Sequence, residues 1–397
     1  MPDPTDPTEN TVPPPPAGKE TILAGRKIVI VVSEDWYFCS HRLPLGKALH
    51  AAGAEVIVAT RVRDHGGIIE QAGLRIIPIG LDRSGLNPLH DLGTLRELLG
   101  IYRRERPDLV HHVALKPTLY GALCARLTGV PAVVNALAGL GYLFSSATLK
   151  ARVLRPVARL GLRALVNRRN SRTILQNPDD VALFESELGA RPDRLALIRG
   201  SGVDTTRFRP HPPPDGTPVA VCVSRMLWDK GIDELVEAAR LLRQRGTDIK
   251  IRLVGPTDKN PASIPQATLD HWRAEGIVDL AGPIGDIPGE YARAHIAVLP
   301  SYREGLPKSL LEAAACGRPM VATDVPGCRE ICREDETGLL VPARSVEPLA
   351  DALERLARDA DLRNRLGARA RQVAESEFAE EVVIAETLAL YRDLLTK

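Results

Sequence analysis

The sequence has no apolar run long enough to cross a membrane. A transmembrane helix needs about 20 predominantly apolar residues, whereas the longest candidate, residues 131–144, is shorter and carries glycine and asparagine at turn-prone positions. Residues 1–26 lack the charged-then-apolar pattern of a secretory signal, and their richness in proline, threonine and aspartate is typical of a disordered tail. We therefore expect neither a spanning helix nor a signal peptide.

Patterns typical of metal binding and of disulfides are also missing. The six cysteines are scattered, without a Cys-X-X-Cys pair or a zinc-like histidine spacing, which predicts reduced thiols, a cytoplasmic location and no bound metal. The acidic string from Asp359 to Asp361 lies in a polar helical region, and we interpret it as solvated surface. A net charge of only +2 indicates no general affinity for nucleic acid. Residues 1–200 nonetheless carry 26 basic against 19 acidic side chains, which indicates an anionic partner on that side.

Short apolar runs alternate with helical segments along the chain, a pattern typical of parallel sheets covered by helices on both faces. The expected strands form two series, at residues 27–33, 55–60, 74–80, 108–113, 132–137 and 172–176, and at residues 219–225, 249–255, 277–282, 295–300, 319–323 and 338–342. The sequence predicts an α/β fold with two Rossmann-like domains, residues 27–208 and 219–379, and a cleft between them. Proline-rich residues 209–218 link the domains, and a helix at about residues 380–397 can pack back on the first one.

Two glutamates, Glu304 and Glu312, follow the apolar run HIAVLP. Glu304 lies in the turn after this expected strand, Pro307 falls where a first helical position is expected, and Glu312 lies about a turn and a half into the next helix. Both carboxylates can therefore point into one crevice at the carboxyl end of the sheet, where open α/β sheets bind ligands. The helix start between them offers N–H groups for a phosphate. Carboxylates beside an anion site indicate a sugar nucleotide.

Two cations, Arg225 and Lys230, follow the first strand of the second series. The turn into the next helix brings them together, and an arginine fork beside a lysine point charge is suited to a diphosphate. The alternative for this pair is two ordinary surface cations. The glutamate segment favours the binding interpretation, because both motifs lie at the carboxyl ends of strands in one sheet.

The motifs SRMLWDKG, VGPTDKNPASI and LPSYREGLPKSLLEAAACGRP together resemble the retaining glycosyltransferases of family 4, which have the GT-B fold and two glutamates separated by seven residues. The resemblance extends from about residue 27 to the C-terminus. It implies catalytic roles for Arg225 and Lys230 at the donor diphosphate and for Glu304 at the transferred sugar, and a ribose contact for Glu312. The donor-binding residues that it implies are Arg225, Lys230, Gly255, Glu304, Gly305, Leu306 and Glu312.

The resemblance also implies the reaction. It implies transfer of a hexose or N-acetylhexosamine from a UDP-sugar with retained anomeric configuration, without a cofactor or an obligatory metal. Two departures put parts of this mechanism in doubt. Many relatives have a Gly-Gly loop after the first strand, where this chain reads SEDWYFCSHRLP, and many have a histidine near Leu137.

The acceptor is expected to bind to the first domain. Within the family, HRLPLGKAL, SGLNP and AGLGYLF resemble the bacterial enzymes that extend undecaprenyl-diphosphate-linked sugars, which implies a lipid-linked glycan acceptor. The candidate acceptor-binding residues are His41, Arg42, His112, Lys116, Gly139 and Gly141. His41 lies in a segment that reads as a loop and is the stronger histidine candidate. A histidine in an apolar strand, such as His112, has the equally weighted alternative of a hydrogen-bonded core residue.

Residues 149–170 are basic and amphipathic, with seven lysines and arginines and no acid. This pattern favours adsorption to an anionic membrane surface, so we expect a peripheral protein at the inner face of the plasma membrane. The alternative is a surface helix whose apolar side belongs to the core, and Pro156 is expected to bend or interrupt it.

Rival functions lead to different expectations. A GT-B sugar-nucleotide epimerase shares the cleft but needs no acceptor. A hydride-transferring dehydrogenase is disfavoured, because no Gly-X-Gly-X-X-Gly follows the first strand. A non-enzymatic membrane scaffold would not need Glu304 or Glu312.

Overall fold

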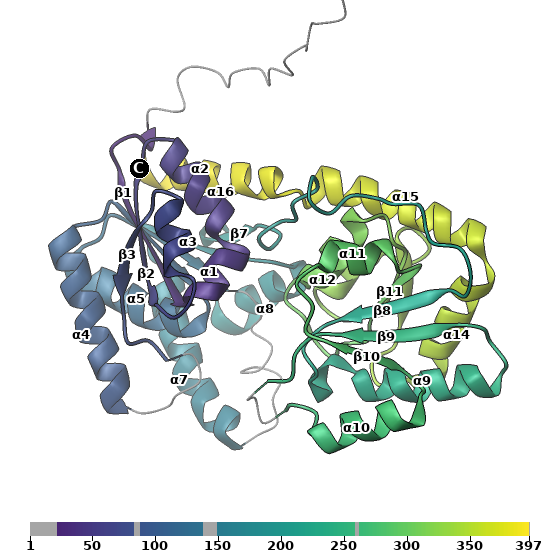
Figure 1. The fold of residues 1–397 in the computed structure, drawn as a ribbon. Coiled ribbons are helices and arrows are strands. Elements are labelled where there is room, and N and C mark those ends of the chain that lie inside the picture. Colours follow the sequence, from purple (N-terminus) through teal and green to yellow (C-terminus); the bar gives the residue numbers. More distant parts are fainter. Residues whose placement is uncertain (1–21, 83–87, 138–148, 259–261, 397) are drawn as a thin grey trace, which may run out of the picture.

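The computed structural model describes residues 22–82, 88–137, 149–258 and 262–396, which form two α/β domains (Figure 1). The first domain contains a parallel seven-stranded sheet of order β3-β2-β1-β4-β5-β6-β7. Its strands are β1 (Lys27–Glu34), β2 (Glu55–Arg61), β3 (Arg75–Pro78), β4 (Leu109–Val113), β5 (Ala132–Ala136), β6 (Ser171–Leu175) and β7 (Leu195–Leu197).

The second domain contains a parallel six-stranded sheet of order β10-β9-β8-β11-β12-β13. Its strands are β8 (Val219–Val223), β9 (Lys250–Val254), β10 (Asp279–Gly282), β11 (Ile296–Leu299), β12 (Met320–Thr323) and β13 (Gly338–Val341). The predicted fold class is therefore confirmed, and each expected strand is present. Strand β7 was not expected, because three partly exposed residues at a sheet edge leave little pattern in the sequence.

Helices cover both sheets. Those of the first domain are α1 (Asp35–His41), α2 (Leu43–Ala51), α3 (Gly66–Gln71), α4 (Pro88–Glu105), α5 (Leu115–Thr128), α7 (Leu149–Val166) and α8 (Pro178–Leu188), with the 3-10 turn η2 (Pro192–Arg194). Those after the linker are η3 (Trp228–Lys230), α9 (Ile232–Gln244), α10 (Gln266–Glu275), α11 (Ile287–Ala292), α12 (Lys308–Ala315), α13 (Cys328–Ile331), α14 (Val346–Arg358), α15 (Ala360–Glu377) and α16 (Glu380–Leu395).

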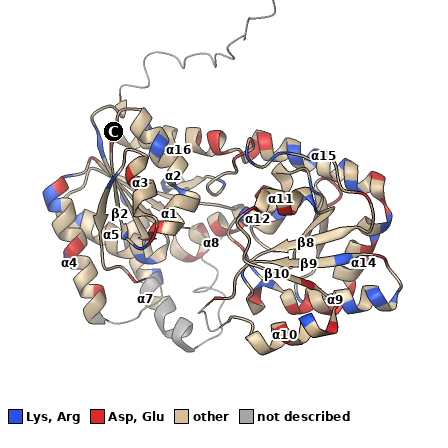
Figure 2. Cartoon of the chain, viewed as in Figure 1, with Lys and Arg blue, Asp and Glu red and all other residues tan. Residues whose placement is uncertain are grey.

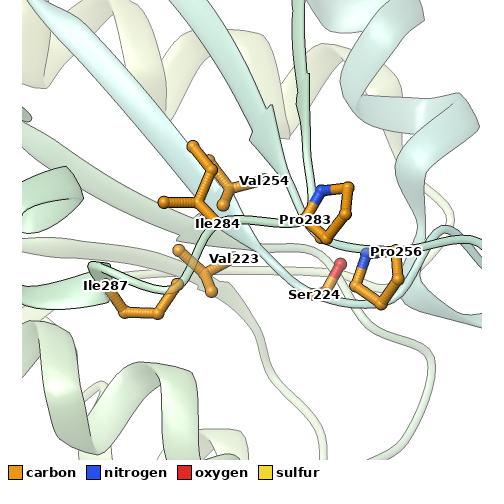
Figure 3. A pocket seen from close by; sticks show the side chains of 8 residues that line it. Val223, Ser224, Val254, Pro256, Pro283, Ile284 and Ile287 are labelled. Atoms are coloured by element: carbon orange, nitrogen blue, oxygen red, sulfur yellow. The ribbon is translucent and has the colours of Figure 1, made fainter.

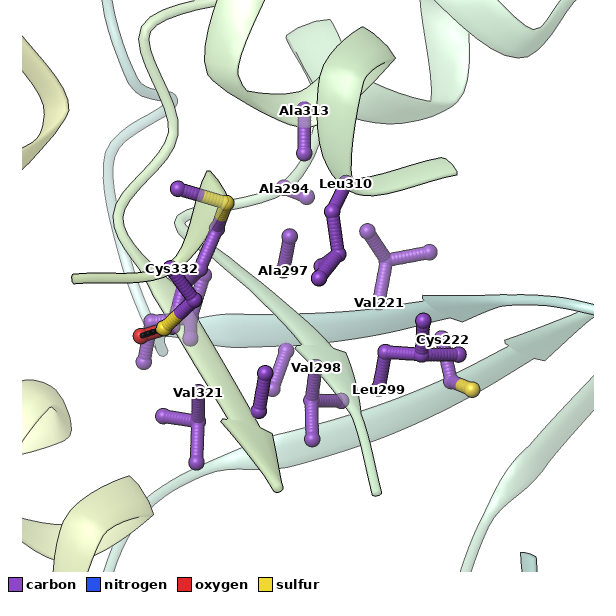
Figure 4. Close-up of a cluster of buried hydrophobic side chains, with 14 of the residues drawn as sticks. Val221, Cys222, Ala294, Ala297, Val298, Leu299, Leu310, Ala313, Val321 and Cys332 are labelled. Atoms are coloured by element: carbon purple, nitrogen blue, oxygen red, sulfur yellow. Dashed lines mark hydrogen bonds between the residues drawn. The ribbon is translucent and has the colours of Figure 1, made fainter. Parts of the chain in front are cut away.

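Burial on both faces explains why the strands read as continuous apolar runs. In β1, Ile28 and Ile30 belong to one apolar core, whereas Val29 and Val31 belong to the core on the opposite face. Successive residues of a strand point to opposite faces, so a sheet covered on both sides needs apolar residues at every position. The second domain repeats this arrangement, and Figure 4 shows Val221 and Val298 of its central strands beneath Leu310 of α12.

The C-terminal helix α16 belongs structurally to the first domain. Val383, Tyr391 and Leu394 are buried in the same core as Ile28 and Ile30. The chain crosses back where Val203 donates a backbone hydrogen bond to Phe378 O, at 2.9 Å. Figure 1 shows α16, in yellow, lying along the first domain after α15 of the second.

Helix α7 runs without interruption from Leu149 to Val166, with Pro156 inside it. The predicted interruption of the helix at this proline is therefore wrong. Its C-terminal half uses Leu162 and Val166 to pack against Phe184 of α8. Leu160 is 71% exposed, so one apolar side chain of this half lies outside the core. Within the described ranges, no helix is both long and apolar enough to cross a bilayer. Figure 2 shows acidic and basic residues interspersed along the helices of both domains.

Candidate functional site

The candidate site lies at the carboxyl ends of β8 and β11, which are hydrogen-bonded neighbours. Lys230 follows β8 through the turn η3, and Glu304 follows β11. Because the two strands are parallel, their carboxyl ends share one edge of the sheet, and the Lys230 ammonium forms an ion pair with the Glu304 carboxylate. Ser301 Oγ donates a second hydrogen bond to Glu304 Oε1, at 2.7 Å. Glu304 is therefore held by two groups in this state.

Gly231 permits this close approach. Its φ of +68° is in the left-handed region, and a Cβ at this position would lie 2.1 Å from Pro300 O. Only glycine accepts both the dihedral angle and the contact. The turn after β8 can therefore lie directly against the end of β11, which brings Lys230 to Glu304.

Lys230 keeps its charge in a largely buried position. Burial lowers the pKa of its ammonium, but the charge and hydrogen bond of Glu304 outweigh burial, and the net pKa is raised above the usual lysine value. The second predicted cation, Arg225, is more exposed and forms an ion pair with Asp258. The site thus presents two permanently positive groups after one strand, as a diphosphate requires.

Glu312, the fifth residue of α12, is partly buried. Burial raises the pKa of its carboxyl from 4.5 to about 7, and the charges of Lys308 and Arg207 oppose this rise only in part. Within the described part of the chain, no residue donates a hydrogen bond to its carboxylate. Its side chain is only partly buried, so the carboxylate stays open to a ligand that brings hydroxyl groups. Pro307, expected at the first helical position, is the N-cap residue instead.

An apolar hollow of about 150 Å³ lies beside these groups, at the carboxyl ends of β8, β9 and β10. Figure 3 shows Pro256, Pro283 and Ile284 around it. Gly255 contributes to its wall, and a Cβ there would lie 1.9 Å from Ser224 O, so the backbones after β8 and β9 are in direct contact. The hollow has the character of a site for a flat, weakly polar ring.

The other two predicted donor residues face the first domain. The carbonyl oxygen of Gly305 accepts a hydrogen bond from Asn177 Nδ2, at 2.8 Å. Leu306 lies against Gly200, where a Cβ would come within 2.9 Å of Leu306 Cδ2. The loop that carries Glu304 is therefore packed between the two domains.

The segment predicted as a loop after β1 is the helix α1. His41 at its end stacks on Tyr37 with ring centroids 4.1 Å apart. Ser40 O accepts a hydrogen bond from Lys308 Nζ, at 2.6 Å, so α1 contacts the start of α12 across the domain boundary. Trp36, in the first turn of α1, is 40% exposed and was not singled out from the sequence.

The remaining predicted acceptor residues do not gather around His41. Arg42, between α1 and α2, is 4% exposed and donates a hydrogen bond to Gly200 O, at 3.3 Å. It is therefore a buried residue of the domain interior. Lys116 bonds to Asp82 O, at 3.1 Å, and to Asp91 Oδ1, at 2.8 Å. Gly139 and Gly141 lie outside the described residues.

His112 does not fit its predicted place in the acceptor site. Its ring is fully buried, with Nδ1 2.8 Å from Asn135 Oδ1 and Nε2 2.9 Å from Tyr102 Oη. Burial lowers the pKa of His112 to about 4, so the ring is neutral at physiological pH. The geometry corrects the assignment: His112 is a hydrogen-bonded core residue, the alternative given by its apolar strand.

Several site residues were missed in the sequence. Ser301 lies two residues after the end of β11, and this position near the carboxyl edge of the sheet was a usable signal. Asn177 and Asp180 begin α8, where Asn177 is the N-cap and accepts from the Asp180 N–H. An asparagine followed by proline is a usual signal for a helix start, but no local pattern indicates the contact of these residues with the Glu304 loop.

Comparisons with known proteins agree with this geometry. The family model "Glycosyl transferases group 1" matches residues 217–359, and "Glycosyl transferase 4-like" matches residues 27–174. A curated relative from Campylobacter jejuni, the N,N'-diacetylbacillosaminyl-diphospho-undecaprenol alpha-1,3-N-acetylgalactosaminyltransferase, is 28% identical, over 88% of this chain and 94% of its own.

Two solved structures show the same fold. Sucrose-phosphate synthase from Thermosynechococcus elongatus aligns with a TM-score of 0.79 and 21% identity, over 94% of this chain and 99% of its own. HepE from Anabaena, in complex with UDP, aligns with a TM-score of 0.72 and 19% identity, over 92% of this chain and all (100%) of its own. Each family model matches one of the two domains, and the chain therefore belongs to the family 4 group of GT-B glycosyltransferases.

Proposed function

We propose that this glycosyltransferase moves a hexose or N-acetylhexosamine from a UDP-sugar, with UDP-GalNAc as the first candidate, to a sugar on a lipid diphosphate during surface glycan or polysaccharide synthesis. The observation that carries the proposal is the arrangement of Lys230, Glu304 and Glu312 around the start of α12. The Campylobacter relative, named for GalNAc transfer to a diphospho-undecaprenol sugar, supports the donor and the acceptor. The UDP complex of HepE supports the nucleotide.

Each part of the donor has a matching group. The uracil ring fits the apolar hollow at Ile284, and the ribose hydroxyls donate to Glu312, which has no other donor within the described residues. Arg225 and Lys230 hold the diphosphate. Glu304 accepts hydrogen bonds from hydroxyls of the transferred sugar, and the amides near Gly305 lie beside it.

The proposed reaction retains the anomeric configuration. The bond between the anomeric carbon and the diphosphate oxygen breaks, and its electron pair goes to UDP. An acceptor hydroxyl forms the new bond on the same face, and its proton goes to the departing phosphate oxygen. The charge that develops lies on UDP, so the fixed charges of Lys230 and Arg225 supply the main stabilisation. In this scheme neither a side-chain base nor a metal ion is required.

A two-stage donor screen tests the proposal. UDP-GalNAc, UDP-GlcNAc, UDP-galactose and UDP-glucose are first compared by thermal shift, and each is then incubated with an undecaprenyl-diphosphate-linked N-acetylhexosamine. We expect UDP-GalNAc to give both the largest shift and a disaccharide product with an α-linkage. Incubation without acceptor is the control: net conversion of one UDP-sugar into another there would identify an epimerase and contradict the transferase.

We also propose that residues 149–170 bind an anionic membrane surface. The seven basic residues of this stretch support the proposal, and so do Leu160 and Arg163, which are exposed beside one another in the helical repeat. Each basic group near an anionic surface contributes about 1 kcal/mol.

Flotation with vesicles tests this membrane contact. The protein is expected to float with vesicles that contain phosphatidylglycerol and to stay behind with phosphatidylcholine alone. The double variant Leu160→Ser, Arg163→Gln is expected to float less, whereas Arg273→Gln, an exposed change on the second domain, is expected to behave as wild type. The proposal would be contradicted if the double variant floated as much as Arg273→Gln, or if the wild-type protein did not float with anionic vesicles.

A further inference from the structure

The loop that carries Glu304 is tethered to the first domain on both sides of that residue. Arg303, which precedes Glu304, donates from Nη2 to Asp180 Oδ1, at 3.1 Å. Gly305, which follows it, accepts at its carbonyl oxygen from Asn177 Nδ2, at 2.8 Å. Both partners belong to the start of α8, at the carboxyl edge of the first sheet.

The tether is built from buried groups. Asn177 is fully buried and Asp180 is 1% exposed. Asn177 Nδ2 also donates to Asp180 Oδ2, at 3.1 Å, and Asn177 Oδ1 accepts from the Asp180 N–H, at 2.8 Å. The two side chains thus fix each other before they reach the loop. Buried, mutually bonded groups lose little further conformational freedom when they hold a third group.

Glu304 is also held from its own domain. Lys230 and Ser301 hold its carboxylate, and its backbone lies against Gly327, where a Cβ would come within 2.9 Å of Glu304 O. The contacts from Asn177 and Asp180 hold the loop from the side of the first domain. These contacts break when the two domains move further apart than they are in this structure.

We infer that Asn177 and Asp180 are positioning residues of the donor site: they hold the Glu304 loop from the opposite domain, so that the donor site is complete only in the closed arrangement. The inference rests on the proposed contact of Glu304 with the transferred sugar. In this arrangement the contact between the domains fixes the geometry at the transferred sugar. Nucleotide binding is not affected, because the groups assigned to UDP lie elsewhere in the second domain.

A neighbouring ion pair provides a matched control. Asp179, also in the first turn of α8, pairs with Arg329 of α13, at 3.2 Å. This pair joins the same two domains but does not touch residues 303–305. The variant Asp179→Asn therefore removes an interdomain ion pair and leaves the tether intact, whereas Asp180→Asn and Asn177→Ala remove the tether.

Three measurements on the full chain test the inference. UDP affinity is expected to be unchanged in Asn177→Ala and Asp180→Asn. Backbone amides of residues 301–306 are expected to exchange hydrogen faster, on the order of 10-fold. With UDP-GalNAc and an undecaprenyl-diphosphate-linked N-acetylhexosamine, kcat is expected to fall on the order of 10- to 100-fold, as for other small misplacements of reacting groups. Asp179→Asn is expected to match wild type in all three.

Several outcomes would overturn the inference. They are unchanged hydrogen exchange in residues 301–306, an equal loss of turnover in Asp179→Asn, or a weaker UDP affinity that accounts for the loss of turnover. If Asp180→Asn does not fold, Arg303→Gln removes the same contact from the surface loop. Failure of the proposed function has a different signature, because the wild type itself would then give no product from these substrates. Failure of the Glu304 contact with the sugar would leave Glu304→Gln with full turnover, whatever the α8 variants do.

Discussion

Replacing Lys230 with alanine is expected to lower kcat on the order of 10²- to 10³-fold, the effect of removing one group that stabilises developing charge. The ammonium is largely buried, and its raised pKa keeps it charged beside the leaving diphosphate. Turnover is measured with saturating donor, so that weaker binding does not mask the effect on kcat. Lys250→Ala, an exposed change at the opposite end of β9, is the control and is expected to retain wild-type turnover.

The same substitution also affects folding, and a second variant separates the two effects. Without Lys230, the carboxylate of Glu304 keeps only the hydrogen bond from Ser301. Breaking a fully buried ion pair costs about 3–5 kcal/mol, and because this pair is part-buried we expect a smaller loss of stability. The double variant Lys230→Ala, Glu304→Gln has no orphaned charge, so it is expected to recover much of this stability while remaining inactive. Wild-type turnover in either variant would remove the diphosphate assignment.

Replacing Glu312 with glutamine is expected to weaken UDP binding and to stabilise the free protein at high pH. The pKa of this carboxyl rises from 4.5 to about 7 in the folded chain. A carboxyl with a raised pKa contributes its full stability below pH 4.5, and this contribution is lost as pH rises through about 7. The ionised group then costs the folded state roughly 3 kcal/mol. Glu312→Gln is therefore expected to be more stable than wild type at pH 8, by up to roughly 3 kcal/mol, and similar at pH 5.

Chemical denaturation at both pH values measures this difference, with Glu70→Gln on the exposed surface of α3 as the control. Calorimetry of UDP binding adds a direct test of the ribose contact. Hydroxyl donors favour the ionised carboxylate, so UDP binding near pH 7 is expected to release more protons from wild type than from Glu312→Gln. A pH-independent gain in the variant, or equal proton release in both proteins, would refute the assignment.

The donor half of the site could be predicted because its residues follow strand ends. Lys230 and Glu304 lie a few residues after apolar runs, and parallel strands place such residues at one edge. The partners from the first domain could not be predicted in this way. Asp180 is 123 residues from Arg303, and their contact depends on how the two domains are oriented, which no local pattern encodes.

The acceptor half was predicted less well for a different reason. A polar side chain in an apolar strand can be a ligand-binding residue or a hydrogen-bonded core residue. Which of the two it is depends on buried partners that lie far away in the sequence. His112 finds Tyr102 and Asn135 in the core, and Arg42 finds the carbonyl of Gly200. The helix α1 was taken for a loop because its seven residues include polar and aromatic groups without a helical repeat.

The position of α16 has a consequence for biosynthesis. The ribosome makes the chain from the N-terminus, and domains generally fold as units during synthesis. The core of the second domain extends from Val203 to Phe378, so it can form as soon as that stretch has emerged. The core of the first domain includes Tyr391 and Leu394 beside Phe38 and Leu49 of its own helices, so part of one face of its sheet stays uncovered until α16 has emerged. The half that is translated first is completed last, and truncation of the C-terminus would damage the start of the protein rather than its end.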